Sequence, residues 1–191
     1  MTKELKKRIV TSTVLLTIVL SCLFINNYTW LVLLIIVSLI SWLEIINLSK
    51  KIWKKKLILF TFSIISFVYL FLFTLITFRA RAHVDGEGIL FVLSVCILSD
   101  VGGYVVGKSV GGKRLTRISP NKTISGSIGS FLFSLLPLIF VSKSFLVVEF
   151  IIILWCLMIS LICQLGDLFI SYLKRSAKVK DTGSFLPGHG G

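Results

Sequence analysis

Long apolar runs, separated by short basic or glycine-rich segments, make up most of this sequence. About 20 apolar residues cross the hydrocarbon core of a bilayer as a helix, and a backbone in lipid must satisfy its own hydrogen bonds. Six runs reach or approach that length, so the pattern predicts an all-α, polytopic membrane helix bundle with about six transmembrane helices. The predicted spans are Ile9–Ile25, Trp30–Leu48, Leu57–Phe78, Ile89–Val106, Ile128–Val141 and Phe145–Cys163. Asn26-Asn27 is expected to form a turn, and Arg79–Gly88 a mixed loop.

The last stretch of the chain changes character. Leu165–Arg175 predicts a separate cytoplasmic amphipathic helix, on which Asp167, Ser171 and Lys174 share one face. A glycine-rich tail, Pro187–Gly191, follows it. A carboxylate beside lysines and exposed backbone amides suits a magnesium–phosphate site. An amphipathic surface helix with a basic, disordered tail is the alternative that this pattern leaves open.

Composition and charge narrow the class of protein. The chain has 191 residues, is 55% hydrophobic and carries a net charge of +13. In a soluble protein that charge would suggest nucleic acid, but in a membrane protein it indicates basic loops that face anionic lipid, so no nucleic-acid partner is predicted. Only Arg79, Arg81 and Lys143 of the 21 lysines and arginines fall on the side opposite the other basic segments. This asymmetry predicts a bacterial inner-membrane protein with both termini cytoplasmic.

No fixed-period repeat or low-complexity linker divides the chain, so residues 1–191 are predicted to form a single integral-membrane domain whose motif-bearing part is 100–191. The cysteines lie inside apolar runs without a Cys-x-x-Cys pair or a Cys/His cluster. They are expected to be small packing residues and neither disulfides nor zinc ligands. They are Cys22, Cys96, Cys156 and Cys163.

Three carboxylates lie within or at the edge of the apolar runs, where a charge is costly and is by default a candidate for function. They are Glu44, Asp100 and Asp167. Glu44 is the weakest candidate, because it could reach nearby cytoplasmic lysines by extending along the helix. Asp100 shares a helical face with small and polar residues that would admit a neighbouring helix or a lipid head group. They are Gly103, Tyr104, Gly107 and Lys108.

The loop after this face is basic and rich in glycine. Ser119 followed by Pro120 predicts a helix start, and a helix N-terminus beside Lys122 would suit a phosphate. The plainer alternative is a positive-inside loop that only orients the protein. Gly102–Ser109 satisfies the spacing of a P-loop, but no α/β pattern surrounds it, so that reading is rejected.

Two blocks of these residues resemble the phosphatidate cytidylyltransferases, the CDP-diacylglycerol synthases. The C-terminal block matches the family signature at Ser171, Lys174, Arg175, Lys180, Asp181, Gly183, Pro187, Gly188, His189, Gly190 and Gly191. The earlier block matches at Asp100, Tyr104, Gly107, Lys108, Gly111, Ser119, Pro120, Lys122 and Thr123. The sequence departs from the family at Gly103, where alanine is common, and at Ser125, where many members have glutamate.

The resemblance implies transfer of a cytidylyl group from CTP to phosphatidate in the lipid bilayer, with Mg²⁺ as cofactor. By this resemblance Asp167 is the metal ligand, and the catalytic residues are Asp167, Lys174, Arg175 and Asp181. The implied substrate-binding residues are Asp100, Tyr104, Lys108, Ser119, Lys122, Thr123, Ser171, Lys180, Gly188, His189 and Gly190. The sequence does not decide between a monomer and a homodimer.

In the family, the signature continues with an Asp-Arg-apolar-Asp segment and then a membrane helix, whereas the sequence given stops at Gly191. From this we expect the 191-residue form to be nearly inactive, because Asp167 would lack a partner carboxylate. Three alternatives stay open: a catalytically inactive lipid-binding homologue, a CTP-dependent polyprenol- or phytol-type lipid kinase, and a small transporter with an ion path along Glu44, Asp100 and Asp167.

Overall fold

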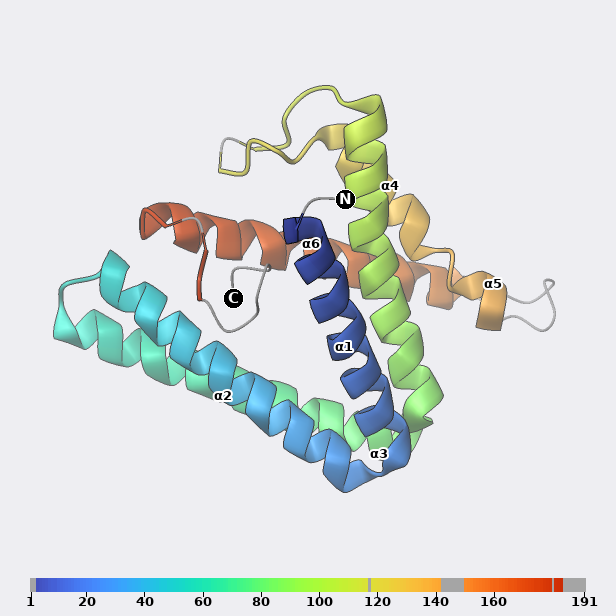
Figure 1. Ribbon diagram of the computed structural model, residues 1–191, viewed down its shortest axis with the longest axis horizontal. Coiled ribbons are helices and arrows are strands. Elements are labelled where there is room, and N and C mark those ends of the chain that lie inside the picture. The colour runs from blue at the N-terminus through green and yellow to red at the C-terminus, as the bar shows by residue number, and fades with distance from the viewer. Residues whose placement is uncertain (1–2, 117, 142–149, 180, 184–191) are drawn as a thin grey trace. The chain divides into compact units, whose positions relative to one another are not determined.

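A computed structural model describes residues 3–116, 118–141, 150–179 and 181–183, and Figure 1 shows its helices. The elements in chain order are α1 (Lys3–Ile25), α2 (Asn27–Ile52), α3 (Lys56–Val110), α4 (Ile124–Ser134), α5 (Leu138–Val141) and α6 (Phe150–Ser176). Within the described ranges, β structure is limited to one isolated antiparallel bridge between Arg114 and Thr123. The predicted all-α fold is confirmed.

Four segments have the length and apolar composition of membrane spans: Asn27–Ile52, Lys56–Val84, Gly86–Val110 and Phe150–Ser176. Two shorter apolar helices, Val10–Ile25 and Ile124–Ser134, accompany them. Large apolar side chains along these helices point outward, as expected where lipid is the solvent. The protein is therefore an integral membrane helix bundle, with four of the predicted six runs reaching span length in the described residues.

The predicted fifth span, Ile128–Val141, is wrong as a continuous helix. α4 ends at Ser134. Hydrogen bonds between residues three apart, from Leu135 N to Leu132 O (3.3 Å) and from Leu136 N to Phe133 O (3.1 Å), form a turn before α5. The cause is Pro137, which has no backbone N–H and whose ring collides with the carbonyl four residues before it in a continuing helix.

Two predicted interruptions are also wrong, because the helices run through them. Arg79–Gly88 was expected to be a loop but is helical within α3. In this segment, Arg81 Nε donates a hydrogen bond to the carbonyl of Leu23 at 2.8 Å, so a cation pairs with a carbonyl that the last turn of α1 leaves without a partner in the helix. Leu165–Arg175 was expected to be a separate helix but continues α6. Neither Pro nor Gly stands between Phe150 and Leu165 to end that helix.

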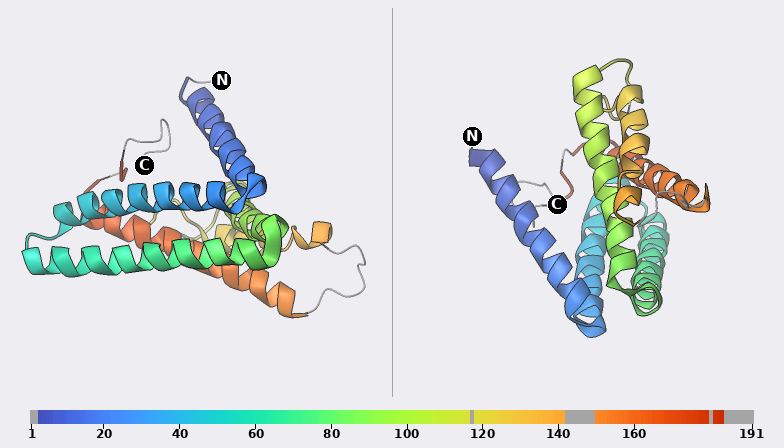
Figure 2. Two further views of the ribbon diagram at one scale, coloured as in Figure 1. Left: turned by 90° about the horizontal axis from the view of Figure 1, so that it is seen from below. Right: turned by 90° about the vertical axis from the view of Figure 1, so that its right-hand side faces the viewer.

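The chain divides into two compact units, one formed by residues up to Gly86 together with those from Leu173 on, the other by Glu87–Tyr172. In the first unit, α2 and the first part of α3 lie antiparallel, side by side (Figures 1 and 2). Trp42 of α2 packs edge-on against Phe67 at 5.4 Å between ring centroids and donates to the carbonyl of Ser63. The hydroxyls of Ser38 and Thr74 bond at 2.8 Å and fix the register of the pair.

The predicted turn between the first two helices is confirmed at Asn26. Its side chain accepts from Thr29 N at 2.8 Å, and Thr29 Oγ1 accepts from Asn26 N, which forms a reciprocal cap. Leu23 and Trp30 are buried beside this turn. Asn27, expected in the turn, is the first residue of α2.

In the second unit, α3 and α4 approach through glycine. A Cβ on Gly102 would lie 2.5 Å from the carbonyl oxygen of Gly129, and one on Gly126 would lie 2.8 Å from that of Gly103. The small-residue face of α3 therefore admits a neighbouring helix, which is one of the two uses the sequence allowed. α3 also meets α6 through a buried bond between the hydroxyls of Ser99 and Ser160, 2.7 Å long.

Candidate active site

A polar cavity of about 350 Å³ lies in the second unit, between α3, α4, α6 and the loop that joins α3 to α4. Its volume is within the range of small-molecule sites. Two carboxylates, an ammonium, and several hydroxyl and amide groups face it. The lining residues are Asp100, Gly103, Tyr104, Leu115, Asn121, Lys122, Thr123, Gly126, Ser127, Ser130, Gln164 and Asp167.

The loop over this cavity folds back on itself. Gly111 and Gly112 have φ values of 64° and 108°, so α3 ends in a left-handed turn that side chains would oppose. The two arms of the loop then bond to each other, Leu115 N to Lys122 O at 2.7 Å and Ile124 N to Lys113 O at 3.0 Å. This pairing places Lys122 over the cavity.

The helix start predicted at Ser119-Pro120 is wrong. Lys122 N donates to Ser119 O at 3.1 Å, which closes a tight turn with Pro120 in its second position, where the fixed φ of proline is also favourable. The helix begins four residues later, at Ile124, and Thr123 caps it by accepting from Gly126 N at 3.1 Å. Ser125, the departure from the family pattern, donates to the carbonyl of Gly111 and ties the two ends of the loop together.

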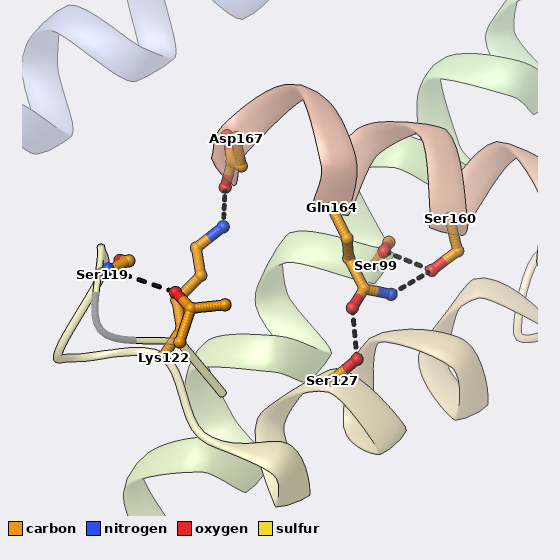
Figure 3. A network of polar contacts seen from close by, with 8 residues as sticks. Ser99, Ser119, Lys122, Ser127, Ser160, Gln164 and Asp167 are labelled. Carbon is orange, nitrogen blue, oxygen red and sulfur yellow. Dashed lines mark hydrogen bonds and ion pairs between the residues drawn. The ribbon is translucent and has the colours of Figure 1, made fainter. Parts of the chain in front are cut away.

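Lys122 and Asp167 meet across the cavity (Figure 3). Lys122 Nζ lies 2.7 Å from Asp167 Oδ2, and the two side chains are 31% and 59% exposed. An ion pair as exposed as this contributes at most about 1 kcal/mol to stability. The pair therefore contributes little to folding, and both residues line the cavity.

A chain of hydrogen bonds holds the amide of Gln164 at the inner wall of the cavity (Figure 3). Ser127 Oγ donates to Gln164 Oε1, and Gln164 Nε2 donates to Ser160 Oγ at 3.3 Å. Ser160 in turn shares its bond with Ser99 on α3. The network links α3, α4 and α6 beside the cavity.

The structure brings together five of the residues named from the sequence: Asp100, Tyr104, Lys122, Thr123 and Asp167. Three others do not line the cavity: Lys108, Ser119 and Ser171. Lys108 instead contacts Tyr104, with its Nζ 3.4 Å from the phenol oxygen and 5.6 Å from the ring centroid.

The remaining named residues belong to the C-terminal block. Lys174, Arg175 and Asp181 belong to the first compact unit. Four more lie outside the residues that the structure describes: Lys180, Gly188, His189 and Gly190.

The site residues named from the sequence do not include four polar residues that line the cavity: Asn121, Ser127, Ser130 and Gln164. A signal was present for two of them, because Gly126, Ser127, Gly129 and Ser130 give α4 a small, polar face inside an apolar helix. Such a face in a membrane helix marks a contact with another helix or with a polar ligand. The four cysteines are free thiols in the structure, and the sulfurs of Cys96 and Cys163 lie 3.4 Å apart.

Fold and site together define a polytopic helical membrane protein with a polar cavity built from two membrane-span helices, a shorter helix and a basic loop. The sequence profile of the Cytidylyltransferase family matches residues 50–191, so the chain belongs to that family.

Curated relatives support the assignment. The chain is 42% identical over 115 residues to a phosphatidate cytidylyltransferase of Bacillus subtilis, and the matched region covers 57% of this chain and 43% of the relative. It is 44% identical over 110 residues to one of Staphylococcus saprophyticus, covering 54% and 41%. It is 45% identical over 105 residues to one of Helicobacter pylori, covering 54% and 39%. In each case, the match spans about two fifths of the relative.

Proposed function

We propose that this protein transfers a cytidylyl group from CTP to phosphatidate, giving CDP-diacylglycerol and pyrophosphate. The observation that carries the proposal is the cavity in which Lys122, from the basic loop, meets Asp167 of α6 at 2.7 Å. Residues of the earlier family-like block meet Asp167 there, and the three relatives described above are named for this reaction.

In the proposed reaction, a phosphate oxygen of phosphatidate attacks the α-phosphorus of CTP. A new P–O bond forms, the bond to the β-phosphate breaks, and pyrophosphate leaves with that electron pair. The attacking phosphate is already anionic, so no general base is needed. The protein's task is to align the reactants and neutralise charge. Lys122, Lys174, Arg175 and Lys180 are the proposed phosphate ligands, the arginine through two parallel bonds.

Asp167 is the proposed ligand of Mg²⁺. Within the described residues, no three His, Cys, Asp or Glu side chains cluster. The residues present nevertheless fit magnesium, because this ion commonly uses one or two carboxylates and completes its shell with substrate phosphates and water. Asp167 is 59% exposed, and Asp100 lines the same cavity. When bound, the ion would neutralise charge on the phosphate oxygens. Lys122, displaced from Asp167, would then be available to hold a phosphate.

We also infer that the protein lies in a bacterial inner membrane with both termini in the cytoplasm. The support is the distribution of lysine and arginine, which concentrates in the N-terminus, 50–56, 108–122 and 174–180. This orientation would put the basic loop and the C-terminal block on the side where CTP is found.

The function is tested with Asp167→Asn, which keeps the size of the side chain and removes its charge. The assay uses a form that carries the Asp-Arg-apolar-Asp segment, because the 191-residue form is expected to be nearly inactive. Membranes or detergent-solubilised protein receive labelled CTP, phosphatidate and Mg²⁺, and CDP-diacylglycerol is measured. We expect the rate to fall by about 10² to 10³, the usual effect of losing a charge-stabilising group. Glu87→Gln, at an exposed glutamate of α3, is the matched control and should keep the wild-type rate.

Near-normal turnover of Asp167→Asn would show that Asp167 is not the metal ligand, and Asp181 would be examined next. The assay also separates the lipid-kinase alternative, because a CTP-dependent kinase would release CDP and phosphorylate a lipid alcohol without consuming phosphatidate.

A further inference from the structure

A carboxylate in the middle of the membrane helix α2 is not used by the proposed chemistry. Glu44 Oε2 accepts a hydrogen bond from Thr182 Oγ1 at 3.0 Å, although 138 residues separate the two along the chain. Glu44 Oε1 is buried and has no hydrogen-bond partner among the described residues. Both residues belong to the first compact unit. The only ion pair in the described part of the chain is Lys122–Asp167, so Glu44 does not use the nearby lysines as the sequence allowed.

The backbone next to Thr182 lies directly against this carboxylate. A Cβ built on Gly183 would collide with the carboxyl group of Glu44. The φ of Gly183 is not in the left-handed region, so what glycine provides here is space for the end of the Glu44 side chain. Gly183 is one of the positions that match the family signature, and Glu44 is the group it makes room for.

The other end of the same segment is held by the cap of α6. Lys178 N donates to Arg175 O and Val179 N donates to Lys174 O, each at 3.0 Å. Lys178 itself is left-handed, with φ 55°. This arrangement is a complete Schellman motif, which turns the chain sharply away from the helix. The cap of α6 and the carboxylate of Glu44 are therefore two fixed points, one before and one after Asp181.

We propose that Glu44 is a positioning residue that holds the Asp181–Gly183 part of the signature in place next to the helix end that carries Lys174 and Arg175. The inference rests on the proposed function, since those residues are proposed there as catalytic. Glu44 precedes the region 50–191 that matches the family profile, so the comparison assigns it no role. It acts through Thr182 and Gly183 and contacts no reacting atom.

The first test compares substitutions that keep the hydrogen bond with those that remove it. Glu44→Gln keeps an acceptor and Thr182→Ser keeps the hydroxyl, so both variants should stay within about threefold of the wild-type kcat. Glu44→Ala and Thr182→Val remove the hydrogen bond, and their kcat should fall tenfold or more, because small displacements of catalytic groups have large effects. Ser38→Ala is the control: it removes a hydrogen bond of the same helix α2, to Thr74, remote in sequence from the signature. It should lower thermal stability without changing kcat.

The second test measures the segment without using catalysis. A cysteine is placed at Val179, and its rate of reaction with a membrane-impermeant maleimide is recorded. Glu44→Ala and Thr182→Val should raise that rate severalfold, while Glu44→Gln and Ser38→Ala should not. Gly183→Ala should raise the labelling rate as Glu44→Ala does. The double variant Glu44→Ala/Gly183→Ala should label no faster than Glu44→Ala alone, since the collision is then removed.

The outcomes separate the two proposals. If the wild-type protein, assayed in the form that carries the Asp-Arg-apolar-Asp segment, makes no CDP-diacylglycerol but the labelling rate rises in Glu44→Ala, the proposed function fails and the contact of Glu44 with the segment is supported. If the wild type is active and Glu44→Ala matches it in both kcat and labelling rate, the inference is overturned. A loss of kcat that follows thermal stability, with labelling unchanged, would reduce Glu44 to a structural role and would also overturn it.

Discussion

Lys122 and Asp167 are 45 residues apart in the sequence, and their side chains lie within hydrogen-bond distance of each other. Both are partly exposed, so their mutual attraction adds little to stability. Under the proposed function, the two side chains would separate to receive a phosphate and a metal ion. The pair therefore accounts for why a lysine of the loop and an aspartate of α6 belong to one site.

The residue-scale prediction concerns Lys122→Gln. It removes the ammonium from the cavity, and we expect the rate of cytidylyl transfer to fall by about 10² or more, with a thermal unfolding temperature close to the wild type. The control is Lys113→Gln, which removes the same charge from an exposed position of the same loop and should have little effect. Equal losses in the two variants would mean that the loop acts only through its total charge.

At the scale of elements, the contact between α3 and α4 depends on glycine. A Cβ on Gly129 would lie 2.5 Å from Val106 Cβ and 2.7 Å from the carbonyl oxygen of Gly102. Backbone cannot move aside as the end of a flexible side chain can. The close approach of the two helices is therefore a property of these positions, and it brings Ser127 and Ser130 of α4 to the cavity.

We predict that Gly129→Ala lowers stability by about 1–3 kcal/mol through overpacking, measured as a fall in the thermal unfolding temperature in detergent. Gly166→Ala is the matched control, since a Cβ on Gly166 of α6 meets nothing within 4 Å. There the same change should be neutral, or stabilising by up to about 1 kcal/mol because alanine favours the helix. Similar destabilisation of both would argue against the α3–α4 contact.

The end of α6 gives a second prediction at this scale. Lys178 occupies the left-handed position of the cap, with φ 55°, where glycine carries no steric penalty. Lys178→Gly should therefore raise stability by about 0.5–1 kcal/mol. Lys178→Ala removes the same charge but keeps the strained Cβ, so it should give no gain. Thermal unfolding of the two variants decides the point, and a gain in both would assign the effect to the charge.

At the scale of the whole molecule, the proposed orientation in the membrane can be tested by cysteine labelling in intact cells. A cysteine at Glu87 should react with an impermeant maleimide added outside, and one at Lys113 should not, because the basic loop is proposed to face the cytoplasm. Both positions are exposed, so a lack of reaction cannot come from burial within the described structure. The reverse pattern would overturn the orientation.

The sequence by itself determined that the protein is a helical membrane bundle, and it named five of the residues that line the cavity. A backbone in lipid has no water to bond, so every long apolar run must become a helix whatever it packs against. The turn at Asn26 was also predicted from the sequence, since the cap that forms it uses only neighbouring residues. Asp100 and Lys122 were named because they match a family-like block, and Asp167 because it is a carboxylate at the edge of an apolar run and the implied metal ligand.

Only the tertiary structure decided where helices run on and which side chains meet. Arg79–Gly88 became helix with Arg81 donating to the carbonyl of Leu23, a partner far away in the sequence. Pro120 closes a turn instead of starting a helix, in a loop whose two arms pair with each other. Neither Gln164 in the cavity nor Glu44 against Thr182 could be placed from hydropathy. Each apolar run forms a helix because of its own lipid surroundings. Which helices pack together depends on the fit of particular side chains and glycines, which hydropathy does not distinguish.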